Sequence, residues 1–218
     1  MAMAAGRCHQ PQTQAAPAQA ELTLVPLWLK LAYTAMTAVV LLIYWRKYGP
    51  ANFLWFSDIA LIGSTLALWL ESSLIASTLA VGVLLPEALW NLSYFGRLLT
   101  GKRITGLTDY MFETERPLWL RMLSLFHVPL TVVLLWLVWR LGYDPRALPA
   151  MLLLCWLVMP VCYWLTDPGR NINWAFGPGG EGVRTRMHPL AYLALLMFVV
   201  FPATYLATHL LLTWLLRS

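Results

Sequence analysis

The chain has 218 residues, of which 60% are hydrophobic and only 11% are charged. Soluble domains carry about 25% charged residues because water must wet their surfaces, so this composition excludes an ordinary soluble domain. The chain also has twelve tryptophans and nine tyrosines, whose amphipathic rings favour the headgroup level of a bilayer. The net charge of +5 comes mainly from loops between apolar runs. It therefore indicates membrane orientation and not a nucleic-acid partner.

Apolar runs of about twenty residues match the ~30 Å hydrocarbon core of a bilayer. Residues 1–21 are rich in Ala, Gln and Pro, which predicts a disordered tail without a signal peptide. Residues 22–218 are predicted to form a single transmembrane domain. The fold predicted for it is an all-α integral membrane bundle of about six transmembrane helices, at residues 25–45, 51–71, 73–94, 118–140, 147–166 and 189–215.

The connections between these runs predict a hairpin and an orientation. Almost nothing separates the second run from the third, so the two should form a tight antiparallel hairpin that brings Asp58 and Glu87 to similar depth. Ten of the fifteen Lys and Arg residues fall on the side of the loops at 46–50, 95–117 and 167–188. Basic loops stay in the cytoplasm, so both termini are predicted to lie outside it.

Several polar side chains fall within the predicted spans. An ionisable group inside a bilayer costs at least ~2.5 kcal/mol, so it usually faces a bundle interior or a cavity. Carboxylates and imidazoles in a low-dielectric pocket act as acids, bases or metal ligands. The candidate catalytic residues lie in the half of the membrane nearer the basic loops: Asp58, Glu87, Asn91, His127 and Asp167. The alternative is that each of them is satisfied locally by neighbouring helices.

Asp58 is the residue on which this hypothesis most depends, because a buried carboxylate must be paired, protonated or used. His127 is the histidine at the most similar predicted depth. We therefore predict that Asp58 and His127 approach within hydrogen-bond or shared-ligand reach, with Asn91 or Asp167 completing the shell.

The connection at 167–188 is rich in both turn-forming and aromatic residues. It is interpreted as a re-entrant or membrane-skimming lid, and a plain connecting loop is the alternative. Its candidate substrate-binding residues are Asn171, Asn173, Trp174 and His188; the two asparagines either cap helices or contact a polar headgroup. The sequence has no HExxH motif and no cysteine pair at zinc spacing, so it assigns no metal ligands and leaves a divalent metal open.

Two segments, YGPANFLWFSDIALI at 48–62 and YWLTDPGRNINWAFGP at 163–178, resemble a group of bacterial multipass membrane proteins that carry no assigned activity. The resemblance runs from about residue 25 to the end and implies a bacterial inner membrane. The chain is also similar, more weakly, to the alkaline ceramidase-type membrane hydrolases, which gather such residues around a metal; Glu87, Asn91, Ser93, His127 and His188 carry this likeness. The paired histidines of that family's last helix are missing here, and the span count is one short.

These patterns lead to one functional hypothesis with two alternatives. The hypothesis is a membrane-embedded enzyme, a hydrolase or transferase, that acts on lipid-like substrates through a polar pocket in the cytoplasmic half. The first alternative is a small transporter or an ion- or proton-translocating subunit that uses the same residues. The second is a non-catalytic scaffold or assembly partner. The sequence predicts the lipid bilayer as the chain's surroundings and says nothing of its oligomeric state.

Overall fold

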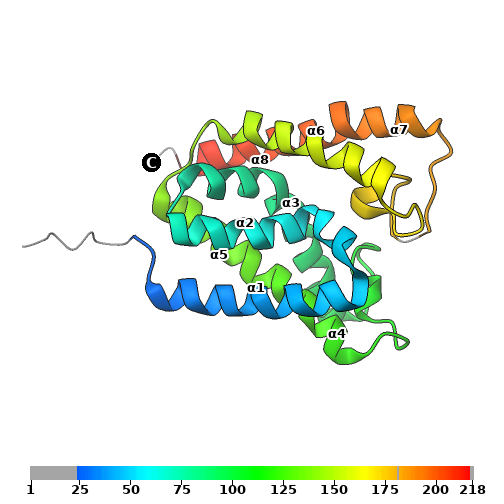
Figure 1. The fold of residues 1–218 in the computed structure, drawn as a ribbon, viewed down its shortest axis with the longest axis horizontal. Coiled ribbons are helices and arrows are strands. Elements are labelled where there is room, and N and C mark those ends of the chain that lie inside the picture. Colours follow the sequence, from blue (N-terminus) through cyan, green and yellow to red (C-terminus); the bar gives the residue numbers. More distant parts are fainter. Residues whose placement is uncertain (1–23, 181, 217–218) are drawn as a thin grey trace, which may run out of the picture.

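The computed structural model describes residues 24–180 and 182–216, and within these ranges the chain has helices, turns and loops but no strand (Figure 1). The predicted tail at 1–21 lies outside the described residues. Five described segments are long and apolar enough to cross a membrane: α1 (Leu27–Tyr48), α3 (Ser73–Thr100), Leu118–Leu141, α6 (Ala147–Leu165) and Pro189–Leu215. A sixth, α2 (Phe56–Leu70), is shorter. The predicted all-α bundle of about six helices is confirmed.

Helix α2 departs most from its predicted span at 51–71. Its 15 residues cover only about 22 Å at 1.5 Å per residue, less than the ~30 Å hydrocarbon core. The chain leaves α1 at Gly49, whose φ of 73° favours glycine, and then makes the short 3₁₀ turn η1 (Pro50–Leu54) before α2 begins. Because η1 occupies Pro50–Leu54 and α2 begins only at Phe56, Asp58 lies in the first turn of its helix and not eight residues along a span.

The second and third spans form the predicted antiparallel hairpin. Glu71 takes a left-handed conformation at the end of α2. Ser72 then caps α3, its hydroxyl accepting a bond from the backbone N–H of Ile75 at 3.3 Å. Gly63 on α2 packs so tightly against Leu79 on α3 that an added Cβ would lie 2.7 Å from a Leu79 methyl carbon. These two positions lie at similar distances from the turn, so the helices run antiparallel.

Helix α3 lies at the centre of the bundle and packs against α2, α5 (His127–Leu141), α6 and α8 (Phe201–Leu215). It reaches Thr100, six residues beyond the predicted end, and Gly101 terminates it with a φ of 71°. The approach to α6 is close, since a Cβ on Gly82 would lie 2.5 Å from the Met151 sulfur. Small residues permit such contacts between membrane helices. α3 therefore carries its polar residues into the interior of the bundle.

The fourth and sixth spans are interrupted. The 3₁₀ turn η3 (Ser124–Phe126) separates α4 (Leu118–Leu123) from α5. In the last span, a π-helical stretch (Leu196–Val200) separates α7 (Pro189–Leu195) from α8. Pro202, which lacks an N–H, follows the π-helical stretch and leaves carbonyls before it without a helical partner. One of them, the Met197 carbonyl, accepts a hydrogen bond from the Trp156 indole N–H at 3.1 Å.

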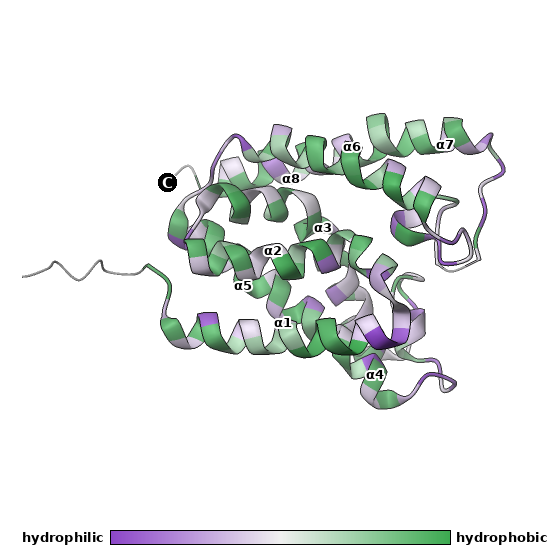
Figure 2. Cartoon of the chain, viewed as in Figure 1, coloured by the Kyte–Doolittle hydropathy of each residue, from purple (hydrophilic) through white to green (hydrophobic). Residues whose placement is uncertain are grey.

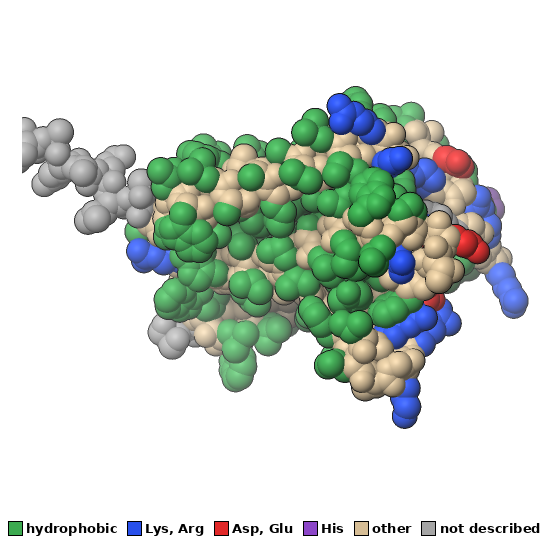
Figure 3. Space-filling view, turned by 90° about the horizontal axis from the view of Figure 1, so that it is seen from below, with side chains coloured by type: hydrophobic (Ala, Val, Ile, Leu, Met, Phe, Trp, Pro, Cys, Tyr) green, Lys and Arg blue, Asp and Glu red, His purple; other side chains and the backbone are tan. Residues whose placement is uncertain are grey.

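The outer surface separates apolar sides from a charged end. The helices are mostly hydrophobic along their length, and the most hydrophilic segments are connections at one end (Figure 2). On the face drawn in Figure 3, most Lys and Arg side chains gather at that same end, while hydrophobic side chains cover the rest. Large apolar side chains such as Leu99, Trp139 and Leu165 are exposed. An apolar surface of this extent requires a nonaqueous partner, which for helices of this length is the lipid bilayer.

Candidate functional site

A short contact between two buried ionisable side chains joins Glu87 to His127. Glu87 lies near the middle of α3, and His127 is the first residue of α5. The Glu87 Oε2 is 2.7 Å from the His127 Nδ1, and the two side chains are only 4% and 11% exposed. The imidazole is held between two aromatic rings, Trp90 on one helix and Phe126 in the turn before α5, with ring centroids 4.4 and 4.3 Å away. The histidine therefore has one orientation.

This geometry leaves the second ring nitrogen of His127 available. An ionised Glu87 accepts the Nδ1 proton and so fixes the tautomer in which Nε2 is an acceptor. Among the described residues, Nε2 has no hydrogen-bond partner. A carboxylate that holds an imidazole by Nδ1 and leaves Nε2 free is the arrangement by which histidine acts as a general base. The sequence predicted both residues in the catalytic group but paired His127 with Asp58.

Asn91, also predicted in the catalytic group, lies one turn further along α3 and forms hydrogen bonds around the Glu87–His127 pair. Its side-chain amide donates to the Glu87 carbonyl at 2.9 Å, to the Thr131 hydroxyl at 3.1 Å and to the His127 carbonyl at 3.4 Å. The Thr131 hydroxyl in turn donates to the His127 carbonyl at 2.8 Å. Asn91 therefore joins α3 to α5 at the level of the Glu87–His127 pair and positions the histidine through its backbone.

A second set of polar groups, which the sequence analysis missed, begins at Trp90, one of the two rings that stack on His127. The Trp90 indole N–H donates to the Tyr110 hydroxyl at 3.2 Å. Tyr110 belongs to the connection after α3, where burial raises the pKa of its hydroxyl to about 12. Nearby, Tyr44 and Ser124 are joined hydroxyl to hydroxyl at 3.0 Å. Nothing in the spacing of these residues indicated contacts across 20 and 80 positions of the chain.

Asp58 is buried, with 3% of its surface exposed, but its partner is Asn52. The Asn52 amide donates to the Asp58 Oδ2 at 3.2 Å, and the Asn52 Oδ1 accepts from the Arg170 guanidinium at 3.0 Å. The predicted hydrogen bond between Asp58 and His127 is absent from the described part of the chain. The reason is the turn η1, which brings Asn52 back over the start of α2.

One oxygen of Asp58 remains without a protein partner. Its Oδ1 is buried and makes no hydrogen bond with any described residue. The nearest cation in the network, Arg170, is occupied by the Asn52 oxygen and by the Tyr48 carbonyl, which lies 2.8 Å away. A buried carboxylate oxygen without a bond is costly, so this atom has the chemistry to hold a proton, a cation or a water molecule.

The connection at 167–188 packs against the start of α2, and we refer to it as the plug. Asn173 caps that helix: its Oδ1 accepts from the Phe56 N–H at 3.0 Å, and its amide donates to the Leu54 carbonyl at 2.7 Å. Asn171 bonds only within its own loop, donating to the carbonyls of Gly177, Gly179 and Gly180. The helix-capping interpretation of Asn173 is confirmed. The two segments at 48–62 and 163–178 thus meet in one network, which contains Asn52, Asp58, Arg170 and Asn173.

The backbone of this plug is strained at three positions. Asn171, Asn173 and Trp174 all have positive φ values, of 47°, 50° and 60°. Asparagine tolerates this conformation better than most residues, whereas for tryptophan it costs about 1–2 kcal/mol. Such strain persists only where the surrounding contacts over-determine the backbone. The side chains predicted to bind substrate therefore maintain the loop, and Trp174 is half-buried in it.

Two other predicted site residues lie outside the polar interior. Asp167 is exposed, and its Oδ1 accepts a bond from the Gly169 N–H at 2.7 Å within its own turn. His188 is exposed at the start of α7 and its side chain makes no capping bond there. His209 lies away from this site, on α8, and contacts the Tyr143 hydroxyl. The convergence predicted from the sequence therefore holds for Glu87, Asn91 and His127, whereas Asp58 bonds to Asn52.

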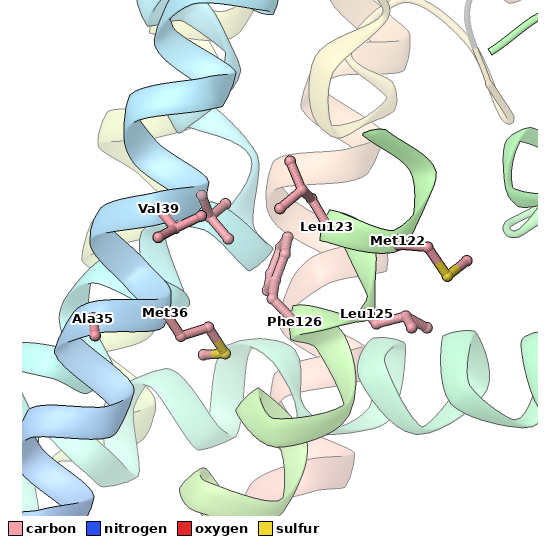
Figure 4. Close-up of a pocket in the computed structure, with 8 residues that line it drawn as sticks. Ala35, Met36, Val39, Met122, Leu123, Leu125 and Phe126 are labelled. Atoms are coloured by element: carbon pink, nitrogen blue, oxygen red, sulfur yellow. The ribbon is translucent and has the colours of Figure 1, made fainter. Parts of the chain in front are cut away.

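An open groove of about 430 Å³ lies next to the Glu87–His127 pair, between α1 and the segment that joins α4 to α5. Figure 4 shows Ala35, Met36 and Val39 on one side and Leu123 and Phe126 on the other. All the lining residues are apolar: Ala35, Met36, Val39, Val40, Met122, Leu123, Leu125 and Phe126. Phe126 connects the groove to the site because its ring also stacks on His127.

In the described ranges, no group of three or more His, Cys, Asp or Glu side chains is placed to hold a metal ion. Comparison with protein-family models, with curated proteins and with solved structures found no match. The function is therefore argued from the geometry of the Glu87–His127 pair, the Asp58 network and the groove.

Proposed function

We propose that this protein is a membrane-embedded enzyme, a hydrolase or transferase, in which His127 is the general base and Glu87 orients it. The observation that carries the proposal is the 2.7 Å contact at Nδ1 together with an Nε2 that has no partner among the described residues. Nε2 removes a proton from water or a substrate hydroxyl as that oxygen bonds to a carbonyl carbon. The proton then passes to the leaving group as the ester or amide bond breaks.

The apolar groove supports a lipid-like substrate. It is open and is lined by apolar side chains alone, so it suits an acyl chain better than a water-soluble molecule. Phe126 forms part of its wall and packs directly on the imidazole. A lipid in the groove therefore lies one aromatic ring away from the proposed base.

The proposal includes a location. The chain is an integral membrane protein by its apolar helices, and its resemblance to bacterial multipass proteins supports the bacterial inner membrane. The excess of Lys and Arg on one side supports a cytoplasmic position for the loops at 46–50, 95–117 and 167–188, with both termini outside. Glu87 and His127 then act in the cytoplasmic half of the bilayer.

The test is lipid turnover by the purified protein reconstituted in vesicles that contain glycerophospholipids, ceramides and diacylglycerol, with products detected by mass spectrometry. His127→Gln removes the base and is expected to lower the rate by about 10²–10⁴-fold. His209→Gln is the matched control, because this histidine contacts Tyr143 and takes no part in the site. A folded His127→Gln variant that turns lipid over at the wild-type rate would refute the proposal.

A second candidate function, proton translocation, is favoured by one specific observation, the unpartnered Oδ1 of Asp58. A buried carboxyl group that takes up and releases a proton is the usual element of a proton relay. Asp58→Asn keeps the shape and removes the exchangeable proton. It is expected to abolish proton flux in vesicles loaded with a pH-sensitive dye while the protein still folds. Unchanged flux in this variant rejects the relay.

A further inference from the structure

The two helices that line the groove, α1 and α4, continue beyond it toward the basic end of the molecule. Met36 and Val40 line it from α1, and the same face of that helix carries Ile43 and Lys47 at the next three- and four-residue steps. On the other side, Met122 lines it from α4, and Trp119 precedes Met122 by three residues on that helix. Lys47 and Trp119, one cation and one indole, therefore lie between the apolar groove and the basic end of the molecule.

Lys47 and Trp119 meet at that end. The Lys47 Nζ lies 5.8 Å from the centre of the Trp119 ring, close enough for a cation–π interaction. Lys47 and its neighbour Arg46 are both exposed, and in the described ranges neither forms an ion pair with a carboxylate. Their positive charges are available to an anion from outside the chain.

The dimensions match one leaflet of a bilayer. Eleven residues separate Lys47 from Met36 on α1, which at 1.5 Å per residue is about 16 Å. Half of the ~30 Å hydrocarbon core is about 15 Å. A lipid with its phosphate at Lys47 thus has its acyl chain along the full length of the groove. A lipid placed in this way has its glycerol near the Trp119 ring, and tryptophan is enriched at that level in membrane proteins.

We propose that the groove between α1 and α4 binds an anionic phospholipid of the surrounding leaflet, with its phosphate at Lys47 and one acyl chain against Met36, Val39 and Phe126. The charge argument selects an anionic headgroup, because a zwitterionic one brings its own ammonium against the lysine. This inference deepens the proposed function and rests on it for the statement that the bound lipid is the substrate. Lipid binding itself is measured without turnover.

The experiment measures the fraction of spin-labelled lipid that the protein immobilises in phosphatidylcholine vesicles, by electron paramagnetic resonance. Wild-type protein is expected to prefer phosphatidylglycerol over phosphatidylcholine about five-fold, the ratio that about 1 kcal/mol per cation at a membrane surface gives. Lys47→Gln is expected to bring this ratio close to one. Lys102→Gln is the matched control, because Lys102 is an exposed cation in a loop on the same basic side, outside the groove.

A second variant fills the groove. Ala35 lines it and is exposed, so Ala35→Trp occupies the space without disturbing the core. It is expected to remove the tightly immobilised population for both lipids at an unchanged unfolding temperature. Equal preference for the two lipids in wild-type protein, equal loss in Lys47→Gln and Lys102→Gln, or normal binding in Ala35→Trp overturns the inference.

The proposed enzyme activity and the proposed lipid-binding site can be refuted independently of each other. Wild-type protein that binds phosphatidylglycerol selectively but forms no product from any lipid would refute the enzyme and leave the binding site standing. Product formation without lipid selectivity would do the reverse. His127→Gln is expected to bind lipid as wild type does, because its side chain does not line the groove.

Discussion

Asn173→Ala is a sharp test of the plug that the 167–188 connection forms against α2. The substitution removes the bond from the Asn173 amide to the Leu54 carbonyl and the bond from the Phe56 N–H to its Oδ1. Each backbone group left in this partly buried position without a partner costs about 1–2 kcal/mol. Holding alanine at a φ of 50° adds about 1 kcal/mol. The expected loss is therefore about 3–5 kcal/mol in the free energy of unfolding.

The measurement is equilibrium unfolding in mixed micelles with increasing mole fraction of SDS, with the detergent and lipid held constant. Asn173→Gly separates the two contributions, because glycine accepts the positive φ but also lacks the amide. It should be more stable than the alanine variant by about 1 kcal/mol. A loss below about 1 kcal/mol in Asn173→Ala would show that this side chain does not hold the plug, and the capping argument would be wrong.

Three further predictions concern packing, pH and orientation. Gly82→Ala should lower the free energy of unfolding by about 1–3 kcal/mol, because its Cβ would meet the Met151 sulfur, whereas Gly180→Ala, with open space around it, should be neutral in the same assay. Hydrogen bonds from Arg146 hold the pKa of Asp144 below its usual value, so the stability they provide is complete above about pH 4 and is lost as the pH falls further. The pH dependence of melting below about pH 4 should accordingly weaken in Asp144→Asn. Cysteines introduced at Gly106 and Arg146 should react with an impermeant thiol reagent from opposite sides of the membrane, and labelling from the same side would contradict the span order.

The sequence alone was sufficient for the membrane class and for most of the helices. The hydrophobic runs predicted α6 to within one residue and the last span at 189–215 as the structure has it. They failed at α2, because periodicity does not distinguish a short 3₁₀ turn such as η1 from the first turn of an apolar helix. The end of α3 was also missed, since its last turns lose the apolar signal while remaining helical to Thr100.

Depth along a span correctly placed Glu87, Asn91 and His127 together, because residues at equal depth on packed helices are close in space. Depth gives no information about the rotation of each helix or the path of a connection. Those features decided that Glu87 contacts His127 and that Asn52 contacts Asp58.

The sequence by itself therefore determined that the protein lies in a lipid bilayer, since the number of apolar residues fixes how much surface must avoid water. The tertiary structure alone decided the partners. Hydrogen bonds depend on donor–acceptor distances of about 3 Å and on direction. Contacts between residues 40 and 118 positions apart, such as Glu87 with His127 and Asn52 with Arg170, arise only once helices and loops are packed.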